Sequence, residues 1–195
     1  SERRLVLCQK SKVLVIIQKL TLMKTSADSL KKSADALNDS SLWEKKKIKK
    51  KDEKTGEEIE VEDYDWDKIT KAVKSFVEDY NDVVKEAGES NTKDVLRNAS
   101  WMTGMTDKNS NMLAKIGITI GKGNKLELDE DALKQADISS LKTVFTGYNS
   151  FVSKISQKAT GISNAANRAS ATYTNNGTYS KTDFSLTSSK IDKEV

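Results

Sequence analysis

Apolar and small residues recur in the N-terminal part of the chain at alternating steps of three and four. They are Val13, Ile16, Leu20, Met23, Ala27, Leu30, Ala34 and Leu37. Side chains with this spacing lie on one stripe of a helix, and lysines and serines occupy its other faces. The pattern predicts a helix within residues 1–42, from about Val13 to Leu37, which Asn38 and Asp39 end.

A second stripe of the same kind occupies residues 148–173. It consists of Val152, Ile155, Ala159, Ile162, Ala166, Ala169 and Tyr173. Its alanines are small and allow another helix to approach closely, so Ile155 and Ile162 supply most of the apolar area. The remaining segment, 174–195, contains mainly Ser, Thr, Asn and Gly, and this composition predicts a flexible tail.

The segment between these stripes, 65–147, is predicted to fold as a helical core. Its first helix has an N-cap at Asp65 and a C-terminal stop at Gly88. Burying each large apolar side chain is worth about 1.5–3 kcal/mol, so we expect its apolar stripe to form the packing centre and not to line a ligand groove. The predicted core residues are Trp66, Ile69, Val73, Phe76, Tyr80, Val83, Ile118, Leu126 and Phe145.

Shorter elements complete this helical core. Gly104 is expected to end or bend a second helix, and Thr106 to begin the next one. Two short strands, 118–120 and 125–128, flank a Gly-Lys-Gly-Asn sequence whose glycines and asparagine suit a tight hairpin turn. The expected helix caps are Asn91 or Thr92, Asp129, and Ser139 or Ser140.

Residues 43–64 form a strongly charged insertion. Six lysines lie between Lys45 and Lys51, and four glutamates then surround Ile59 and Val61. Opposite charges on neighbouring strands contribute roughly 0.2–1 kcal/mol per pair, so this pattern predicts a hairpin with one basic and one acidic strand. The alternative is that the lysine run binds nucleic acid or an anionic surface, but the nearby glutamates would neutralise such a patch.

Composition narrows the possible chemistry. Among 195 residues, 36% are hydrophobic and 6% aromatic, and there is no proline, which together favour an elongated helical body over a compact globule. The net charge of +4 indicates no general affinity for polyanions. Without histidine, and with Cys8 as the single cysteine, the chain cannot form Ser-His-Asp or Cys-His catalytic sites, ordinary zinc sites or an internal disulfide. We therefore expect no catalytic residue, cofactor, metal site or small-molecule substrate. The apolar run Val13–Ile17 is too short to span a membrane.

Several short motifs occur in a fixed order between about residues 66 and 165. A helix carries Phe-Val-x-x-Tyr-Asn, and Gly-Ile, Leu-x-Leu-Asp and Val-Phe follow it. The matching residues are Phe76, Val77, Tyr80, Asn81, Gly117, Ile118, Leu126, Leu128, Asp129, Val144 and Phe145. This order resembles the C-terminal half of the flagellar hook-associated protein 2 family, which forms the filament cap.

The resemblance implies a structural, self-associating protein of mainly α fold. We expect an elongated helical bundle or coiled coil with one or two small β-hairpins, in a short cap-like relative or an accessory flagellar protein. Its partners would be copies of itself or other flagellar axial or export proteins outside the cell. The alternatives are a secreted or surface interaction module unrelated to flagella, and a cytoplasmic location.

The two terminal stripes must be covered by some other apolar surface. They can pair with each other, with the central helix or with another subunit. The predicted interface residues are Val13, Ile16, Leu20, Met23, Leu30, Leu37, Val152, Ile155, Ala159, Ile162, Ala166, Ala169 and Tyr173.

Overall fold

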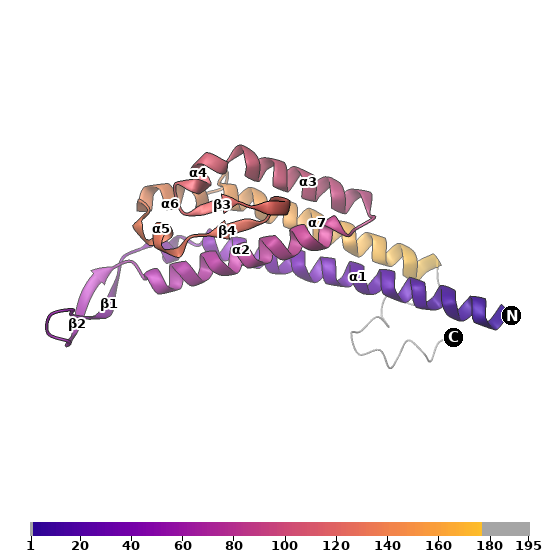
Figure 1. The fold of residues 1–195 in the computed structure, drawn as a ribbon, viewed down its shortest axis with the longest axis horizontal. Coiled ribbons are helices and arrows are strands. Elements are labelled where there is room, and N and C mark those ends of the chain that lie inside the picture. The colour runs from indigo at the N-terminus through magenta and orange to yellow at the C-terminus, as the bar shows by residue number, and fades with distance from the viewer. Residues whose placement is uncertain (1, 177–195) are drawn as a thin grey trace.

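The computed structural model describes residues 2–176 and is mainly helical, with two small antiparallel hairpins (Figure 1). This confirms the predicted fold class. In chain order the elements are α1 (Glu2–Leu37), the 3-10 turn η1 (Ser40–Trp43), β1 (Lys46–Lys51), β2 (Glu58–Asp63), α2 (Trp66–Gly88), α3 (Lys93–Lys108), α4 (Ser110–Ala114), β3 (Ile118–Ile120), η2 (Lys122–Asn124), β4 (Leu126–Leu128), α5 (Glu130–Gln135), α6 (Ile138–Phe145) and α7 (Phe151–Asn176).

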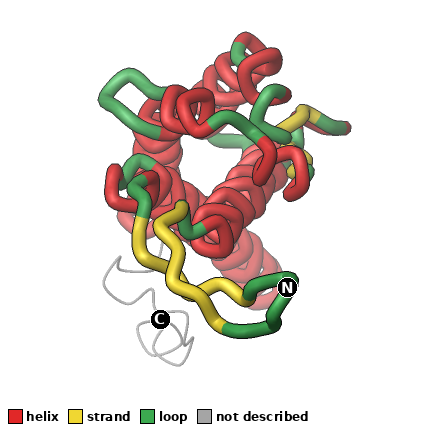
Figure 2. Tube along the Cα trace, turned by 90° about the vertical axis from the view of Figure 1, so that its left-hand side faces the viewer, coloured by secondary structure: helices red, strands yellow, loops and turns green. Residues whose placement is uncertain are grey.

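Four long helices form the body of the molecule. α1 packs against both α2 and α7, and α3 packs against α7 and α2. Seen along the long axis in Figure 2, these helices surround a common interior, which their apolar side chains fill. α1 and α7 run antiparallel, since Asp28 contacts Ser163 and Asp35 contacts Ser156. The body is therefore a helical bundle held by the apolar stripes of its own helices.

An aromatic cluster ties the end of α1 to three other helices. The Trp43 ring stacks on Phe145 with centroids 5.5 Å apart, and its indole N–H donates to the Leu37 carbonyl at 2.8 Å. Phe76 meets Phe145 and Phe151 edge to face, at 6.5 and 6.3 Å between centroids. The carbonyl that Trp43 satisfies belongs to the last residue of α1, which would otherwise be unpaired in a buried site.

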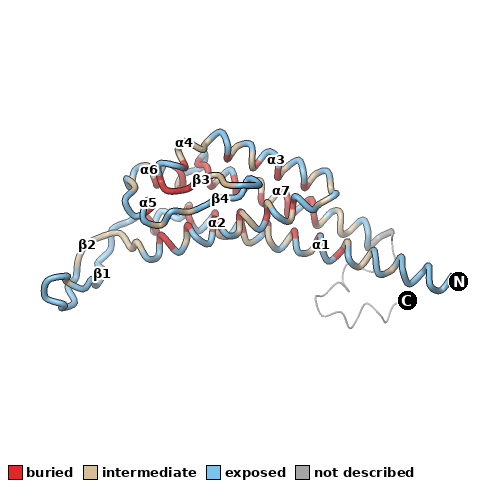
Figure 3. The backbone as a smooth tube through the Cα atoms, viewed as in Figure 1, coloured by how far each residue is buried: buried red, intermediate tan, exposed pale blue. Residues whose placement is uncertain are grey.

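α1 begins at Glu2, well before the predicted start at Val13. The first turns contain neither proline nor glycine, so nothing in them breaks a helix. Residues 2–9 are all exposed, as Figure 3 shows. A periodic pattern of burial is therefore missing there, which explains why the sequence pattern did not reveal these turns.

The prediction for α3 was wrong at Gly104, because α3 continues through this residue and α4 begins only at Ser110. A glycine inside a helix costs only about 1 kcal/mol relative to alanine. The buried face of α3 outweighs that cost. It includes Thr106, predicted to begin a new helix, whose hydroxyl donates to the Met102 carbonyl at 2.9 Å.

Aspartates occupy the N-caps of α2, α5 and α6. Asp65 and Asp129 cap α2 and α5 through their side chains, as predicted. Asp137, and not Ser139 or Ser140, occupies the N-cap of α6, and its side chain accepts from the Ser140 N–H. An aspartate combines the capping acceptor with a negative charge that the helix dipole favours.

Three predictions at element ends hold only in part. Trp66, predicted to be core, is half-buried at the first position of α2, where its ring meets the Tyr64 ring at 6.2 Å. Thr92 occupies the N-cap of α3 but makes no side-chain capping bond. α7 extends to Asn176, so the predicted tail is helical in its first residues. The rest of that tail, 177–195, lies outside the described residues.

Candidate functional site

The motif residues of α2 meet the β3–β4 hairpin directly. The Asn81 amide donates to the Leu126 carbonyl at 2.9 Å and accepts from the Leu126 N–H at 2.7 Å. This side chain pairs with β4 as a neighbouring strand would and fastens the hairpin to α2. Gly117 precedes β3 with φ 85°, and a Cβ there would lie 2.6 Å from the Asp129 carbonyl oxygen. Only glycine fits this position.

Tyr80 joins α2 to α3 inside the body. Its hydroxyl donates to Thr106 Oγ1 at 2.8 Å, and both side chains are buried. Burial raises the pKa of Tyr80 to about 12, against a smaller opposing effect of the hydrogen bond. Tyr80 therefore stays neutral at physiological pH. Tyr80, Asn81 and Gly117 thus hold α2, α3 and the β3–β4 hairpin together by packing and hydrogen bonds.

Most residues predicted to form an interface lie inside the single chain. The buried ones are Leu20, Met23, Leu30, Leu37, Val152, Ile155, Ala159, Ile162 and Ala166, while Val13, Ile16 and Ala169 are half-buried and Tyr173 is 40% exposed. Of the pairings that the sequence left open, the structure has α1 against α7 and α2 of the same chain. Ile17 is also fully buried, although it is one position off the predicted stripe.

Two polar contacts one heptad apart fix the register of α1 and α7. The Ser163 hydroxyl donates to Asp28, and the Ser156 hydroxyl donates to Asp35, each at 2.6 Å. A lysine four residues before each aspartate adds an ion pair of 2.5 Å. Partial burial raises the pKa of each carboxyl. The hydrogen bonds from lysine and serine outweigh it, so both pKa values lie below the ordinary one.

The first turns of α1 expose apolar side chains. Leu5 and Leu7 are 65% and 66% exposed, and Val6 and Val15 are about half exposed. In Figure 1 the N-terminal end of α1 runs on past the end of α7, and we call residues 2–15 the α1 overhang. Several exposed apolar side chains within one short segment are a feature of protein–protein contact surfaces.

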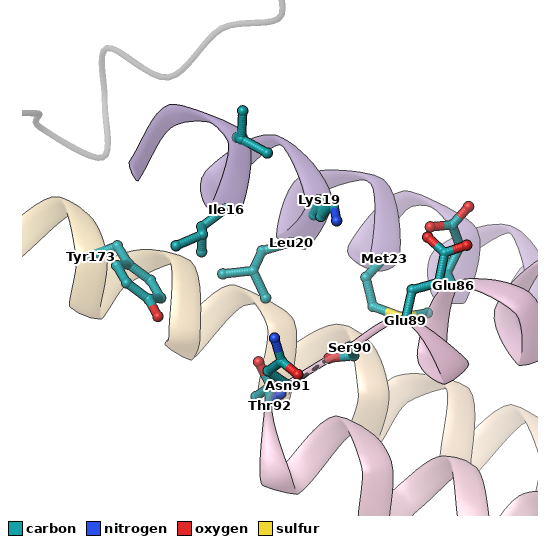
Figure 4. Close-up of a pocket in the computed structure, with 11 residues that line it drawn as sticks. Ile16, Lys19, Leu20, Met23, Glu86, Glu89, Ser90, Asn91, Thr92 and Tyr173 are labelled. Atoms are coloured by element: carbon teal, nitrogen blue, oxygen red, sulfur yellow. Dashed lines mark hydrogen bonds between the residues drawn. The ribbon is translucent and has the colours of Figure 1, made fainter. Parts of the chain in front are cut away.

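A groove of about 200 Å³ adjoins the overhang, where α1, α7 and the connection between α2 and α3 meet (Figure 4). Ile16, Leu20 and Met23 of α1 line it together with Tyr173 of α7, and residues 89–92 form its polar wall. The exposed Tyr173 ring thus borders a surface groove. The groove therefore lies beside the overhang at this end of the bundle, with Val15 common to both.

The β1–β2 hairpin projects from the opposite end of the body (Figure 1). It places a basic strand against an acidic one, and the Lys50 ammonium lies 2.5 Å from Asp63. The facing pairs include Lys47 with Glu62, Lys49 with Glu60 and Lys51 with Glu58. The lysine run is therefore not an isolated basic patch.

The described part of the chain holds no group of three or more Cys, Asp or Glu side chains arranged to bind a metal ion. Across residues 2–176, no helix combines the length and the apolar character needed to cross a membrane. The described surface exposes large apolar side chains on the overhang and also at Leu96, Trp101 and Tyr148, and it carries the charged hairpin.

The comparison with protein families matches residues 90–195 to the C-terminus of flagellar hook-associated protein 2. No curated protein and no solved structure matches the chain. The matched region covers more than half of the chain and contains the β3–β4 hairpin with Gly117 and Leu126, while Asn81 contacts it from α2. The chain belongs to the flagellar hook-associated protein 2 C-terminus family.

Proposed function

We propose that this protein is a cap-related structural subunit of the bacterial flagellum that assembles outside the cell and catalyses no reaction. Its partners are copies of itself or other flagellar axial proteins, and it binds them by packing helices together. Family membership supports the flagellar structural role. The exposed α1 overhang is the observation that supports assembly by helix packing.

In an isolated molecule the overhang has little to stabilise it and leaves apolar side chains exposed to water. It continues the packed part of α1, but a helix end without tertiary packing frays in water. Leu5 and Leu7 are about two-thirds exposed, and full burial of a large apolar side chain is worth about 1.5–3 kcal/mol. Packing against another helix would therefore stabilise the overhang and supply part of the free energy of association.

The buried part of α1 cannot serve the same purpose. Leu30 and Leu37 are fully buried within the chain. A second subunit could reach them only if the bundle opened, which would expose the core. On α1, the overhang and its groove are therefore the main apolar surface that remains for a neighbour.

Light scattering coupled to size exclusion tests this proposal. We expect wild type to elute above the mass of one chain, 21.6 kDa, in a concentration-dependent manner. The double variant Leu5→Asp/Leu7→Asp should elute as a monomer, because a charge opposes burial of that surface. Its thermal stability should equal that of wild type at concentrations where both are monomeric. Leu96→Asp on α3, at a leucine 41% exposed, is the matched control and should behave as wild type. A wild type that is monomeric at every concentration, or a double variant that still associates, would contradict the proposal.

Labelling the protein in whole cells tests its location. Flagellated cells should carry it outside, on the flagellum, and cells without flagellar export should retain it inside. Equal amounts outside both kinds of cell would separate the protein from the flagellum.

A further inference from the structure

The β1–β2 hairpin has two free edges. Among the described residues its strands pair only with each other, and Figure 1 shows the hairpin standing clear of the helices. Each outer edge therefore presents backbone N–H and C=O groups that no strand satisfies. Such edges are templates for pairing with another strand.

The register defines which groups face outward. The Asp52 N–H donates to the Glu57 carbonyl at 2.9 Å, which continues the ladder by one bonded pair beyond Lys51 and Glu58. Bonded and non-bonded pairs alternate along an antiparallel ladder. The outward backbone groups thus belong to Lys47, Lys49 and Lys51 on β1 and to Glu58, Glu60 and Glu62 on β2.

The two edges carry opposite charges. Within the described chain, Lys47 and Lys51 on one edge and Glu60 and Glu62 on the other make no ion pair, and Lys49 reaches Glu58 only at 3.7 Å. Lysine on an edge strand normally prevents pairing, because two basic edges repel. Here a basic edge finds its complement in the acidic edge of a second copy, while like edges repel.

We propose that β1 of one copy pairs antiparallel with β2 of the next copy, so that the hairpins of adjacent subunits join into one sheet. The contact is head-to-tail, since each subunit offers a different edge to each neighbour. This inference rests on the proposed self-association. Subunits that lie side by side with parallel axes bring their overhangs together at one end and their hairpins together at the other.

A charge-swapped variant tests the pairing without disturbing the hairpin itself. It carries Lys47→Glu, Lys49→Glu, Lys51→Glu, Glu58→Lys, Glu60→Lys and Glu62→Lys. Within the swapped hairpin, and between two copies of the swapped variant, opposite charges still face each other. The variant alone should therefore assemble as wild type does. Against wild type, however, each edge meets its own sign of charge. The variant has the same composition and mass as wild type, so one of the two proteins is isotope-labelled before mixing. In native mass spectrometry at low salt, mixed assemblies should then be depleted at least about tenfold relative to random mixing.

A second pair of variants tests the backbone contact. Lys49→Pro and Lys49→Ala both remove the charge, but only proline removes the outward N–H, and an edge strand tolerates proline there. We expect Lys49→Pro to raise the concentration needed for association about tenfold above that of Lys49→Ala. Equal association of the two variants would overturn the proposal.

The outcomes separate this inference from the proposed function. If wild type never associates, both fail. If wild type associates and Leu5→Asp/Leu7→Asp disperses it, while the swapped variant mixes freely with wild type, only the hairpin pairing is wrong. The hairpin proposal also fails if the swapped variant mixes freely but no longer binds a different flagellar protein, since the hairpin would then serve that partner.

Discussion

The burial of Leu30 provides a quantitative test of the bundle. Leu30 on α1 is fully buried, and Leu30→Ala removes three carbon atoms. At about 0.8 kcal/mol for each, the lost transfer free energy is about 2.4 kcal/mol, and the cavity left behind raises the total to about 3–5 kcal/mol. In a chain of this size the melting temperature falls about 2–4 °C per kcal/mol, so we expect a decrease of roughly 10 °C.

Leu22→Ala is the matched control for this substitution. Leu22 lies on the same helix but is 49% exposed, so the same change should alter stability by no more than about 0.5–1 kcal/mol. Urea denaturation measures both free energies of unfolding, and light scattering measures the assembly of both variants under conditions where they are folded. Leu30→Ala should assemble as wild type does. If it loses assembly while its unfolding free energy is unchanged, Leu30 lies between subunits and the reasoning is refuted.

Two further predictions concern pH and helix packing. Because Asp28 and Asp35 have pKa values below the ordinary one in the folded state, their contribution is fully present above about pH 4–5 and is lost as pH falls through the folded pKa values. The variant with both aspartates replaced by asparagine should therefore show a smaller loss of stability in acid titrations followed by circular dichroism. Gly104→Ala should stabilise α3 by about 0.5–1 kcal/mol, because nothing lies within 4 Å of the added Cβ. Gly161→Ala on α7 should not increase stability in this way, because its Cβ would lie 2.7 Å from the Asn98 amide oxygen. Equal shifts of the two glycine variants in thermal melts would contradict the packing between α3 and α7.

The helices were predictable where burial is periodic. From Leu20 to Leu37, buried residues follow the three-four rule, so the sequence shows both the helix and its buried face. The charged hairpin was also predictable, since its lysines and glutamates occupy separate runs that meet in register. In both cases the signal is local in the sequence.

Features that depend on distant residues could not be predicted in this way. A stripe shows that a helix is covered but not which helix covers it, so the choice between another subunit and α7 required the structure. The contact of Asn81 with Leu126 spans 45 positions in the sequence, and no local pattern indicates it. Gly104 was misjudged because its tolerance depends on the packing of the opposite face of α3.

Hydrogen exchange measured by peptide as a function of protein concentration tests the central claim most directly. The claim is that α1 packs within the chain from about Ile16 to Leu37 and offers residues 2–15 to a neighbour. We predict that amides of residues 20–37 are protected at every concentration, while those of residues 2–15 gain protection only as the protein associates. Protection of residues 20–37 that appears only on association, with residues 2–15 unchanged, would contradict the account.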